Sequence, residues 1–305
     1  MSLVVVGSIA FDAVKTPVGE RERMLGGSVV HFSLAASFFS EVRVVGPVGD
    51  DFGEEEYTVL QARGVNTDDV ERAEGETFFW AGRYEDDLNT RVTEDTRLGV
   101  FEDFQPKLSE ASREADIVFL GNIQPDLQRD VRAQCDGASL VGLDSMNLWI
   151  DTARDSLVAA VREVDLVMMD EAEIRMLTGE PNLLRAARGV MDLGPHTVVA
   201  KQGDHSVALY REDEFFALPA YPLETVNDPT GAGDCFAGGF LGSLAASRGG
   251  ADGSALRRAT AYGSVLGSFC VEEFGTERLQ RLSREEIDER YAELQRMTAL
   301  DAAPA

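Results

Sequence analysis

Cysteine and histidine are scarce in this 305-residue chain, which contains three of each. The cysteines, Cys135, Cys235 and Cys270, are odd in number and far apart, with no CxxC pair and no nearby cluster of histidines. A disulfide framework or a zinc site built from closely spaced ligands would show one of these patterns. The sequence therefore predicts neither, and we expect Cys235 to be an ordinary buried residue of a helix.

Positive charge is sparse as well. Lysine and arginine number 28 against 54 aspartates and glutamates, which gives a formal charge of −26, and the acidic residues are spread along the chain. A protein that binds nucleic acid or an anionic membrane needs a basic surface to neutralise phosphates. We therefore expect no nucleic-acid or membrane partner. The acidic surface fits either ordinary solubility or a high-salt environment.

Long apolar segments and the common phosphate-binding loops are also missing. The apolar run at residues 1–6 is too short for a signal peptide or a membrane span, so we interpret it as a first strand and expect a cytoplasmic protein. The chain has no GxxxxGK[ST] loop and no set of protein-kinase loops. Any nucleotide must therefore be bound by a different glycine-rich turn.

Such a turn occurs at residues 228–240, which read DPTGAGDCFAGGF and lead into an apolar helix. The first N–H groups of a helix lack internal partners, so the amides of Gly231, Ala232 and Gly233 could hold an anion. Asp234 would repel a phosphate, but it is well placed as a base for a hydroxyl that attacks one. The pattern indicates phosphoryl transfer. For GAGD alone, a glycine-rich helix start with a dipole-stabilising aspartate is an equal alternative.

The whole segment resembles the C-terminal signature of the ribokinase-like (PfkB) family of sugar and nucleoside kinases. In that family the aspartate matching Asp234 is the catalytic base, and the amides matching Gly231 to Gly233 form an anion hole for the transferred phosphate. Residues 42–53, VRVVGPVGDDFG, match a second family segment. We expect its acidic pair, Asp50 and Asp51, to cap a helix over residues 51–63.

The acceptor side of the predicted site draws on two early segments. Asp12 follows the first strand, at the edge where open α/β sheets bind ligands, and the family's matching aspartate grips sugar hydroxyls. Gly26 and Gly27 match the paired glycines of the family's first signature, whereas His31 replaces a substrate-binding asparagine. His31 is therefore either a substrate ligand or a buried core histidine. The alternative for Asp12 is an ordinary turn residue.

Strands and amphipathic segments alternate along the rest of the chain. We predict strands at 117–120, 140–144, 166–169 and 197–200, separated by amphipathic segments at 126–134, 153–163 and 171–193. This βαβ rhythm predicts an α/β, doubly wound, mostly parallel sheet flanked by helices, as in ribokinase-like proteins.

A second, smaller sheet is expected beside this core. Residues 13–25 and 76–104 should form a small β lid, and residues 1–12, 26–75 and 105–300 the core. Family members carry such a lid over the acceptor site. The aromatic residues at 78–84 either cover the substrate or form a homodimer contact through the lid.

Acidic and amide side chains follow two of the predicted strands. Asn147 lies close to an acceptor-binding element of the family, although the spacing differs. Asp170 and Glu173 stand where the family has NxxE, whose glutamate orders the magnesium–phosphate network. The resemblance therefore implies a metal role for Glu173 and leaves one for Asp170 open. A purely structural role is the alternative, because acidic residues favour the first turn of any helix.

The resemblance also implies a nucleotide site. The loop that contains Lys201 and Gly203 matches one that borders the nucleotide, and Gly203 permits a tight turn. Thr230 precedes the anion hole, and Ser264 belongs to a helix whose family counterpart lines the adenine pocket. Lys201 either reaches a phosphate or is a solvated loop lysine. The expected cofactors are ATP and Mg²⁺, with K⁺ left open.

These features favour an ATP-dependent kinase that phosphorylates an alcohol of a small-molecule sugar or nucleoside. Two alternatives remain. A vitamin or hydroxymethylpyrimidine kinase of the same fold would normally lack both the lid and the early glycine pair. A non-catalytic sugar- or nucleotide-binding protein should have lost Asp234 or the anion-hole glycines, and this chain retains them.

Overall fold

The apolar run at the start of the chain forms a strand that is buried on both faces. In β1 (Leu3–Val6) every residue is at most 1% exposed in the computed structural model, which describes residues 1–247 and 252–300. Leu3 and Val5 pack into one hydrophobic core, and Val4 and Val6 pack into a second one. Since successive side chains of a strand point to opposite faces, the two cores lie on the two sides of the sheet.

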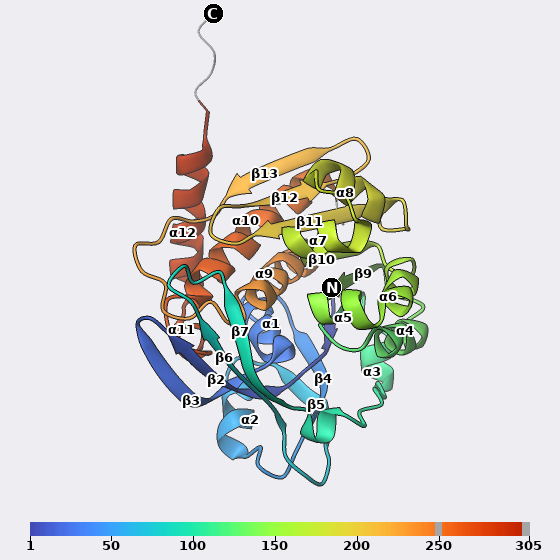
Figure 1. Cartoon of the computed structure of the whole chain (residues 1–305), viewed down its shortest axis with the longest axis vertical. Helices are drawn as coiled ribbons and strands as arrows, with labels where there is room; N and C mark the ends of the chain where they lie inside the picture. Colours follow the sequence, from blue (N-terminus) through green and yellow to red (C-terminus); the bar gives the residue numbers. More distant parts are fainter. Residues whose placement is uncertain (248–251, 301–305) are drawn as a thin grey trace, which may run out of the picture.

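The sheet that contains β1 confirms the predicted α/β architecture (Figure 1). In the described residues it has nine strands, in the spatial order β13 (Phe215–Pro219), β12 (Ser206–Tyr210), β11 (Thr197–Gln202), β10 (Leu166–Asp170), β9 (Leu140–Asp144), β8 (Ile117–Leu120), β1, β4 (Val42–Val48) and β5 (Asn66–Arg72). Pairing is parallel from β5 to β11. The edge strands β12 and β13 are antiparallel.

Helices cover both faces of this sheet, and the two cores divide them into two sets. The core containing Leu3 and Val5 takes residues from α1 (Ser28–Ala36), α2 (Glu54–Gln61), α9 (Ala232–Ala246), α10 (Gly253–Cys270), α11 (Glu277–Arg281) and α12 (Arg284–Thr298). Along the other core lie α3 (Glu110–Arg113), α4 (Pro125–Gln134), α5 (Asn147–Thr152), α6 (Arg154–Val161), α7 (Glu171–Thr178) and α8 (Leu183–Met191). No helix in the described parts of the chain is both long and apolar enough to cross a bilayer.

The described residues also form a separate four-stranded sheet, which contains much of the predicted lid and which we call the lid sheet. Its order is β3 (Gly19–Gly26), β2 (Ala10–Thr16), β6 (Phe78–Tyr84) and β7 (Arg91–Arg97), and a short 3-10 helix, η1 (Gly99–Phe101), leads back to the core. Figure 1 shows these strands, dark blue and teal, gathered on one side of the molecule. Because β2 begins at Ala10, the lid sheet itself carries Asp12, which therefore lies in a strand and not in the turn after β1.

Two details of the predicted helices are wrong. The N-cap residue of α2 is Gly53, and Asp50 and Asp51 instead accept hydrogen bonds from the distant backbone N–H groups of Gly75 and Thr77, at 3.0 and 2.8 Å. These carboxylates therefore accept hydrogen bonds from the backbone that leads into β6. The sequence around residues 50 and 51 gives no sign of this long-range contact. The predicted segment 171–193 is two helices, because Gly179 ends α7 in a left-handed conformation (φ 71°).

Glycines allow α9 to pack tightly between two other helices. A Cβ atom at Gly238 would lie 2.2 Å from the carbonyl oxygen of Phe32 in α1, and one at Gly242 would lie 2.9 Å from Ala36 Cα. On the opposite side, a Cβ atom at Gly239 would lie 2.9 Å from the carbonyl oxygen of Tyr262 in α10. Since non-bonded atoms do not approach so closely, only glycine fits at these positions.

We predict that Gly238→Ala destabilises the protein, although alanine is normally the better helix former by about 1 kcal/mol. The added methyl group overlaps the backbone of α1, so the free energy of unfolding should fall by about 1–3 kcal/mol. Urea unfolding measures the change. The matched control is Gly137→Ala, since no atom lies within 4 Å of that Cβ position. The control should stay within about 0.5 kcal/mol of wild type, and a neutral Gly238→Ala would contradict the packing argument.

Candidate active site

The start of α9 presents unpaired backbone donors. Its N-cap residue, Gly231, has φ 77° and ψ −1°, a left-handed conformation that glycine adopts at little cost. Of the three predicted anion-hole amides, that of Ala232 donates to the carbonyl oxygen of Pro229 at 3.2 Å. Within the described chain, the N–H groups of Gly231 and Gly233 make no hydrogen bond. The positive end of α9 therefore offers two free donors.

Asp234 lies in the first turn of α9, where it is partly buried. Burial and the negative charge of Asp144 raise its pKa to about 6, against the opposing effect of His31, Lys201 and Arg91. Such a carboxylate is still ionised at pH 7, yet it is more basic than an exposed aspartate. That combination suits a group that must accept a proton.

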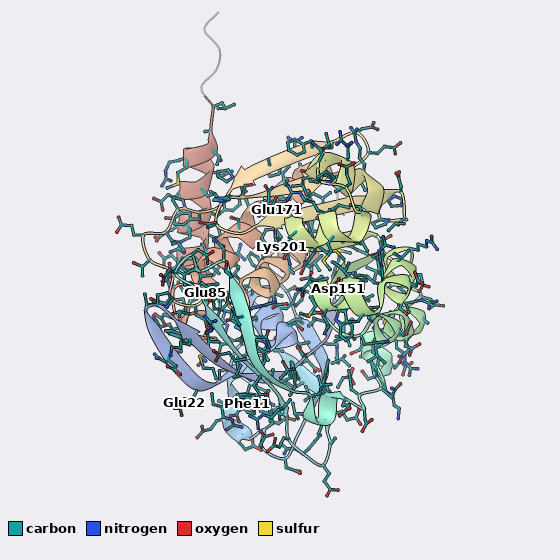
Figure 2. All side chains as sticks on the ribbon, viewed as in Figure 1. Phe11, Glu22, Glu85, Asp151, Glu171 and Lys201 are labelled. Carbon is teal, nitrogen blue, oxygen red and sulfur yellow. The ribbon has the colours of Figure 1, made fainter. Side chains whose placement is uncertain are left out.

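Lys201, at the end of β11, lies beside this helix start and not in solvent. Its Nζ is 2.9 Å from Oδ2 of Asp144 and 3.1 Å from the position that a Cβ atom of Gly233 would occupy. Burial opposes its charge, but Asp144 and Glu173 outweigh that effect and raise the pKa of Lys201 above its usual range. Figure 2 shows Lys201 near the middle of the molecule, whereas Glu22 lies at the edge. The solvated-loop alternative for Lys201 is therefore wrong.

Asp170 and Glu173 are joined in a capping box at the start of α7. An oxygen of Asp170 accepts from the N–H of Glu173 at 2.7 Å, and an oxygen of Glu173 accepts from the N–H of Asp170 at 2.9 Å. Burial and the like charges of Asp144 and Asp170 raise the pKa of Glu173 to about 8. Both residues thus have a structural role, and each keeps a second carboxylate oxygen outside the capping box.

The two early glycines shape the surroundings of Asp12. A Cβ atom at Gly26 would lie 1.9 Å from Oδ2 of Asp12, so a side chain at residue 26 would displace this carboxylate. Gly27, with φ 90°, is the N-cap residue of α1. Burial raises the pKa of Asp12 to about 6, opposed by His31 and by the N–H of Gly27. The paired glycines therefore let a buried carboxylate lie against the start of α1.

His31 is fully buried beneath the phosphate-binding turn predicted at the start of α9. A Cβ atom at Gly231 would lie 2.4 Å from Cγ of His31. Burial disfavours the charged ring, but the Cys270 thiol and the carboxylates of Asp234 and Asp12 raise the pKa of His31 to about 9. His31 therefore lies in the interior beneath Gly231 and within electrostatic reach of both carboxylates, but its Nε2 has no hydrogen-bond partner in the described residues, unlike that of a satisfied core histidine.

The lid contributes residues that the sequence did not single out. The hydroxyl of Tyr84, at the end of β6, lies 3.3 Å from Oγ1 of Thr230, and Arg91 at the start of β7 lowers the pKa of Asp234. The only signal for these residues was the aromatic and β-rich character of residues 76–93. Asn89, in the turn between the two strands, lies 3.5 Å from Asp204. The lid hairpin therefore reaches both the start of α9 and the loop after β11.

A cleft of about 410 Å³ lies on the Lys201 side of α9. Its lining includes the turn Asp87 to Asn89, the loop with Lys201 and Gly203, the segment 220–226, the start of α9 with Ala232 and Gly233, and Ser264 in α10. Three of the four predicted nucleotide residues therefore share one cleft. The fourth, Thr230, is adjacent to Pro229, which also lines it.

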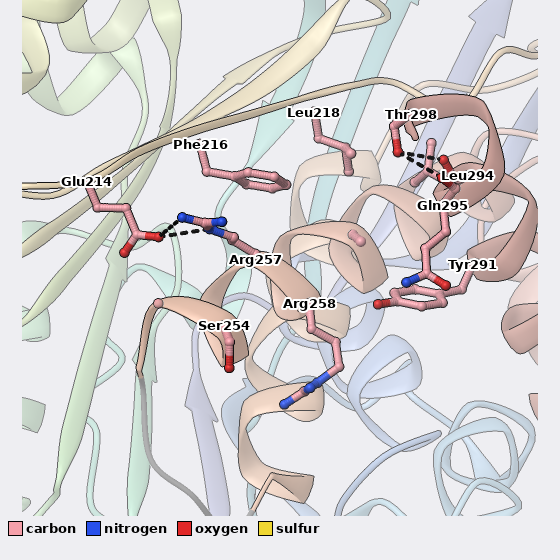
Figure 3. A pocket seen from close by; sticks show the side chains of 12 residues that line it. Glu214, Phe216, Leu218, Ser254, Arg257, Arg258, Tyr291, Leu294, Gln295 and Thr298 are labelled. Carbon is pink, nitrogen blue, oxygen red and sulfur yellow. Dashed lines mark hydrogen bonds and ion pairs between the residues drawn. The ribbon is translucent and has the colours of Figure 1, made fainter. Parts of the chain in front are cut away.

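A larger hollow, of about 510 Å³, lies between β13, α10 and α12 (Figure 3). In it Arg257 pairs with Glu214, with Nε and Nη2 at 2.8 and 2.7 Å from the same carboxylate oxygen. None of the candidate site residues lines this hollow. Lys201, Gly203, Ala232, Gly233 and Ser264 instead line the cleft beside α9.

Asn147 is not part of the group around Asp234 as far as its contacts show. It is exposed at the start of α5, and its side-chain oxygen accepts from the N–H of Leu148 at 3.0 Å. In the described chain it makes no hydrogen bond with another candidate residue. Its acceptor role remains a prediction from the resemblance.

A glycine-rich helix start with a nearby carboxylate, set between a cleft and a second buried carboxylate, defines a phosphotransferase of the sugar and nucleoside kinase class. The chain belongs to the pfkB family of carbohydrate kinases, whose family model matches residues 2–281. It is therefore an enzyme of the kind that the early resemblance implied, a kinase with an alcohol group as acceptor.

Individual relatives agree with this assignment. The chain is 30% identical to a cytidine kinase of Thermococcus kodakarensis over 255 residues, which cover 81% of this chain and 90% of that protein. It is 25% identical to a nucleoside kinase of Methanothermobacter thermautotrophicus over 309 residues, 90% of this chain and 91% of that protein. The fold is shared with the nucleoside kinase of Burkholderia thailandensis solved with inosine: TM-score 0.77, 18% identity, 95% of this chain and 97% of that one.

We predict that Lys201→Met destabilises the unliganded protein, because it leaves the buried Asp144 carboxylate without its partner. The free energy of unfolding should fall by about 3 kcal/mol. Adding Asp144→Asn should recover part of the loss, so urea unfolding of the two single variants and the double variant forms a test cycle.

The matched control for this cycle is an exposed pair, Lys15 and Glu20, whose side chains are 60% and 59% exposed. Lys15→Met should change the free energy of unfolding by less than about 1 kcal/mol. Strict additivity of the Lys201 and Asp144 substitutions would contradict the proposed coupling.

Proposed function

We propose that this enzyme transfers the γ-phosphate of ATP to a hydroxyl group of a nucleoside, with Asp234 as the base. The observation that carries the proposal is the position of Asp234. It lies at the positive end of α9, with Lys201 and the cleft on one side and His31 and Asp12 within electrostatic reach. A base for phosphoryl transfer must stand between the acceptor hydroxyl and the phosphate, and the position of Asp234 supports that role.

The chain's own groups would perform the transfer as follows. ATP would occupy the cleft, with its terminal phosphate against the free N–H groups of Gly231 and Gly233 and near Nζ of Lys201. Asp234 would accept the proton of the acceptor hydroxyl as its oxygen attacks the phosphorus. Because these donors are fixed in place before the reaction, they can stabilise charge that develops on the transferred group without rearrangement.

The residues near Lys201 fit a divalent cation. Glu173 is buried among like charges that raise its pKa to about 8, and such repulsion is relieved when a cation binds. We propose that Glu173, and Asp170 through its second oxygen, hold Mg²⁺ directly or through water. Bound with the nucleotide, Mg²⁺ would neutralise charge on the terminal phosphates. A dependence on K⁺ is tested by comparing turnover in K⁺ with turnover in Na⁺.

A nucleoside is the proposed acceptor because two relatives that match most of the chain are named a cytidine kinase and a nucleoside kinase. Asp12 would bind hydroxyl groups of its ribose, and Tyr84 would bring the lid against Thr230 to close the site. We retain the lid-mediated homodimer as part of the proposal, since β3 and β7 are the outer strands of the lid sheet.

We predict that Asp234→Asn lowers kcat by about 10²–10⁴, because the amide cannot accept the proton. ADP release is measured with ATP and Mg²⁺ against cytidine, inosine, ribose and fructose, and wild type should be most active with a nucleoside. Nucleotide affinity, measured by calorimetry, should change little. Full turnover by the variant would contradict the assignment of the base, and inactivity of wild type with all nucleosides would contradict the acceptor.

The pH profile of the wild-type enzyme provides a control for this prediction. The value of kcat/KM, which reports ionisations of the enzyme before its substrates bind, should fall as the pH drops through about 6, where Asp234 becomes protonated. A carboxyl group whose pKa is raised by folding favours the folded state more as it becomes protonated. This group therefore does not contribute to acid unfolding near pH 6, and the loss of activity should be reversible.

Asp12→Ala should act on the acceptor alone. Removal of a buried carboxylate that accepts hydroxyl hydrogen bonds should raise the acceptor KM by about 10- to 1,000-fold. The KM for ATP should stay within about threefold, because the nucleotide occupies the other side of Asp234. Steady-state kinetics with each substrate varied in turn distinguish the two. Equal impairment toward both substrates would mean that Asp12 supports the fold and not the acceptor.

A further inference from the structure

Three sulfur and nitrogen ligands meet in the interior although they are far apart in the sequence. His31 comes from α1, Cys235 from α9 and Cys270 from the end of α10, and each is at most 1% exposed. Nδ1 of His31 lies 3.9 Å from Sγ of Cys235 and 3.9 Å from Sγ of Cys270. All three ligand atoms lie within 4.8 Å of one another. We call these three residues the His–Cys–Cys cluster.

The spacing of the cluster matches that of a soft metal site. Zinc binds histidine nitrogen at about 2.0–2.1 Å and cysteine sulfur at about 2.3 Å, so tetrahedral or trigonal angles place nitrogen and sulfur about 3.6–3.8 Å apart. The observed separations of 3.9 Å differ from this by a few tenths of an ångström. Small side-chain rotations would therefore suffice to enclose an ion.

The polar atoms of the cluster are poorly satisfied by the protein. Nε2 of His31 is buried and has no hydrogen-bond partner in the described residues. The two thiols donate weak hydrogen bonds of 3.6 Å, Cys235 to the carbonyl oxygen of His31 and Cys270 to that of Thr230. Among the described residues, Nδ1 of His31 meets only the two sulfur atoms, so no strong hydrogen bond holds either ring nitrogen and Nδ1 is open to a ligand.

We propose that the His–Cys–Cys cluster binds one thiophilic d¹⁰ cation of the Zn²⁺ class. The ligand atoms are Nδ1 of His31 and the two Sγ atoms. When the ion binds, both thiols and Nδ1 of the charged His31 ring lose their protons to solvent, so three protons leave for each ion bound.

The ion would lie directly beneath the phosphate-binding turn that we propose. A Cβ atom at Gly231 would lie 2.4 Å from the His31 ring, so only backbone separates the cluster from the phosphate-binding turn proposed at the start of α9. Gly231 itself is partly exposed, which gives an entry path through local movement of this turn. The ion would tie α1, α9 and α10 together beneath the turn and add positive charge near the transferred phosphate.

Cobalt provides a direct test, because Co²⁺ bound by thiolates absorbs through sulfur-to-metal charge transfer, whereas Co²⁺ bound by carboxylates does not. The full-length protein is reduced, stripped with a chelator and titrated with Co²⁺ at high salt, which screens adsorption to the acidic surface. We expect a charge-transfer band that saturates at one equivalent and disappears when Zn²⁺ is added. Binding without this band, or no binding, would overturn the proposal.

The third cysteine supplies the matched control. Cys135 is equally buried, but it lies at the end of α4 outside the cluster. Cys235→Ala and Cys270→Ala should each weaken Zn²⁺ binding by more than about 100-fold, since loss of an outer-shell partner alone costs 10- to 100-fold. Cys135→Ala should bind like wild type, and a similar loss in that variant would overturn the assignment.

The Tm, measured with and without Zn²⁺, tests the site even where a cysteine variant folds poorly. Zn²⁺ should raise the Tm of wild type and of Cys135→Ala, because an ion that binds only the folded state stabilises it. His31→Asn keeps both thiols and should lose most of this Tm shift. An unchanged shift in His31→Asn would exclude His31 as a ligand and contradict the proposed site.

Discussion

The close packing of α9 against α1 and α10 is the constraint on which the candidate site depends. Gly238 and Gly242 bring α9 onto the backbone of α1, and Gly239 brings it onto α10. This contact fixes the start of α9 directly above His31 and beside Lys201. The start of α1 in turn carries Gly27, next to Asp12. Without the glycines the helices would separate, and the groups that we propose to act on the acceptor hydroxyl and the phosphate would no longer lie close together.

The electrostatics of the site follow from placing many carboxylates in a buried setting with few cations. Asp12, Asp234 and Glu173 all have raised pKa values, chiefly because burial disfavours their charged forms. Lys201 is held between acidic groups and compensates only part of this charge. Such a site gains from ligands that bring hydrogen-bond donors or cations, which is what a sugar hydroxyl and a magnesium nucleotide provide. The residues whose pKa values are shifted are therefore the same residues that we propose to act in the reaction.

The lid links the two halves of the site. Tyr84 touches Thr230 at the start of α9, while Asn89 lies near Asp204 at the edge of the cleft. Both residues belong to the hairpin of β6 and β7, so a movement of this hairpin would change the surroundings of the α9 start and of the cleft together. Asp12 also lies in the lid sheet. The closure of the lid and the positioning of the acceptor that we propose therefore depend on the same small sheet.

The sequence alone determined the α/β class, the central strands, the presence of a second, smaller sheet and the glycine-rich start of α9. These features depend on local patterns: continuous apolar runs, βαβ alternation and a turn that leaves helix donors free. Only the tertiary structure decided that Asp51 caps the lid connection and not α2, that Lys201 is buried against Asp144, and that Tyr84 meets Thr230. It also brought His31, Cys235 and Cys270 together from three helices, although their spacing in the chain predicts no metal site. Contacts between distant segments depend on how helices pack, and that information is spread over many side chains and is not contained in any one motif.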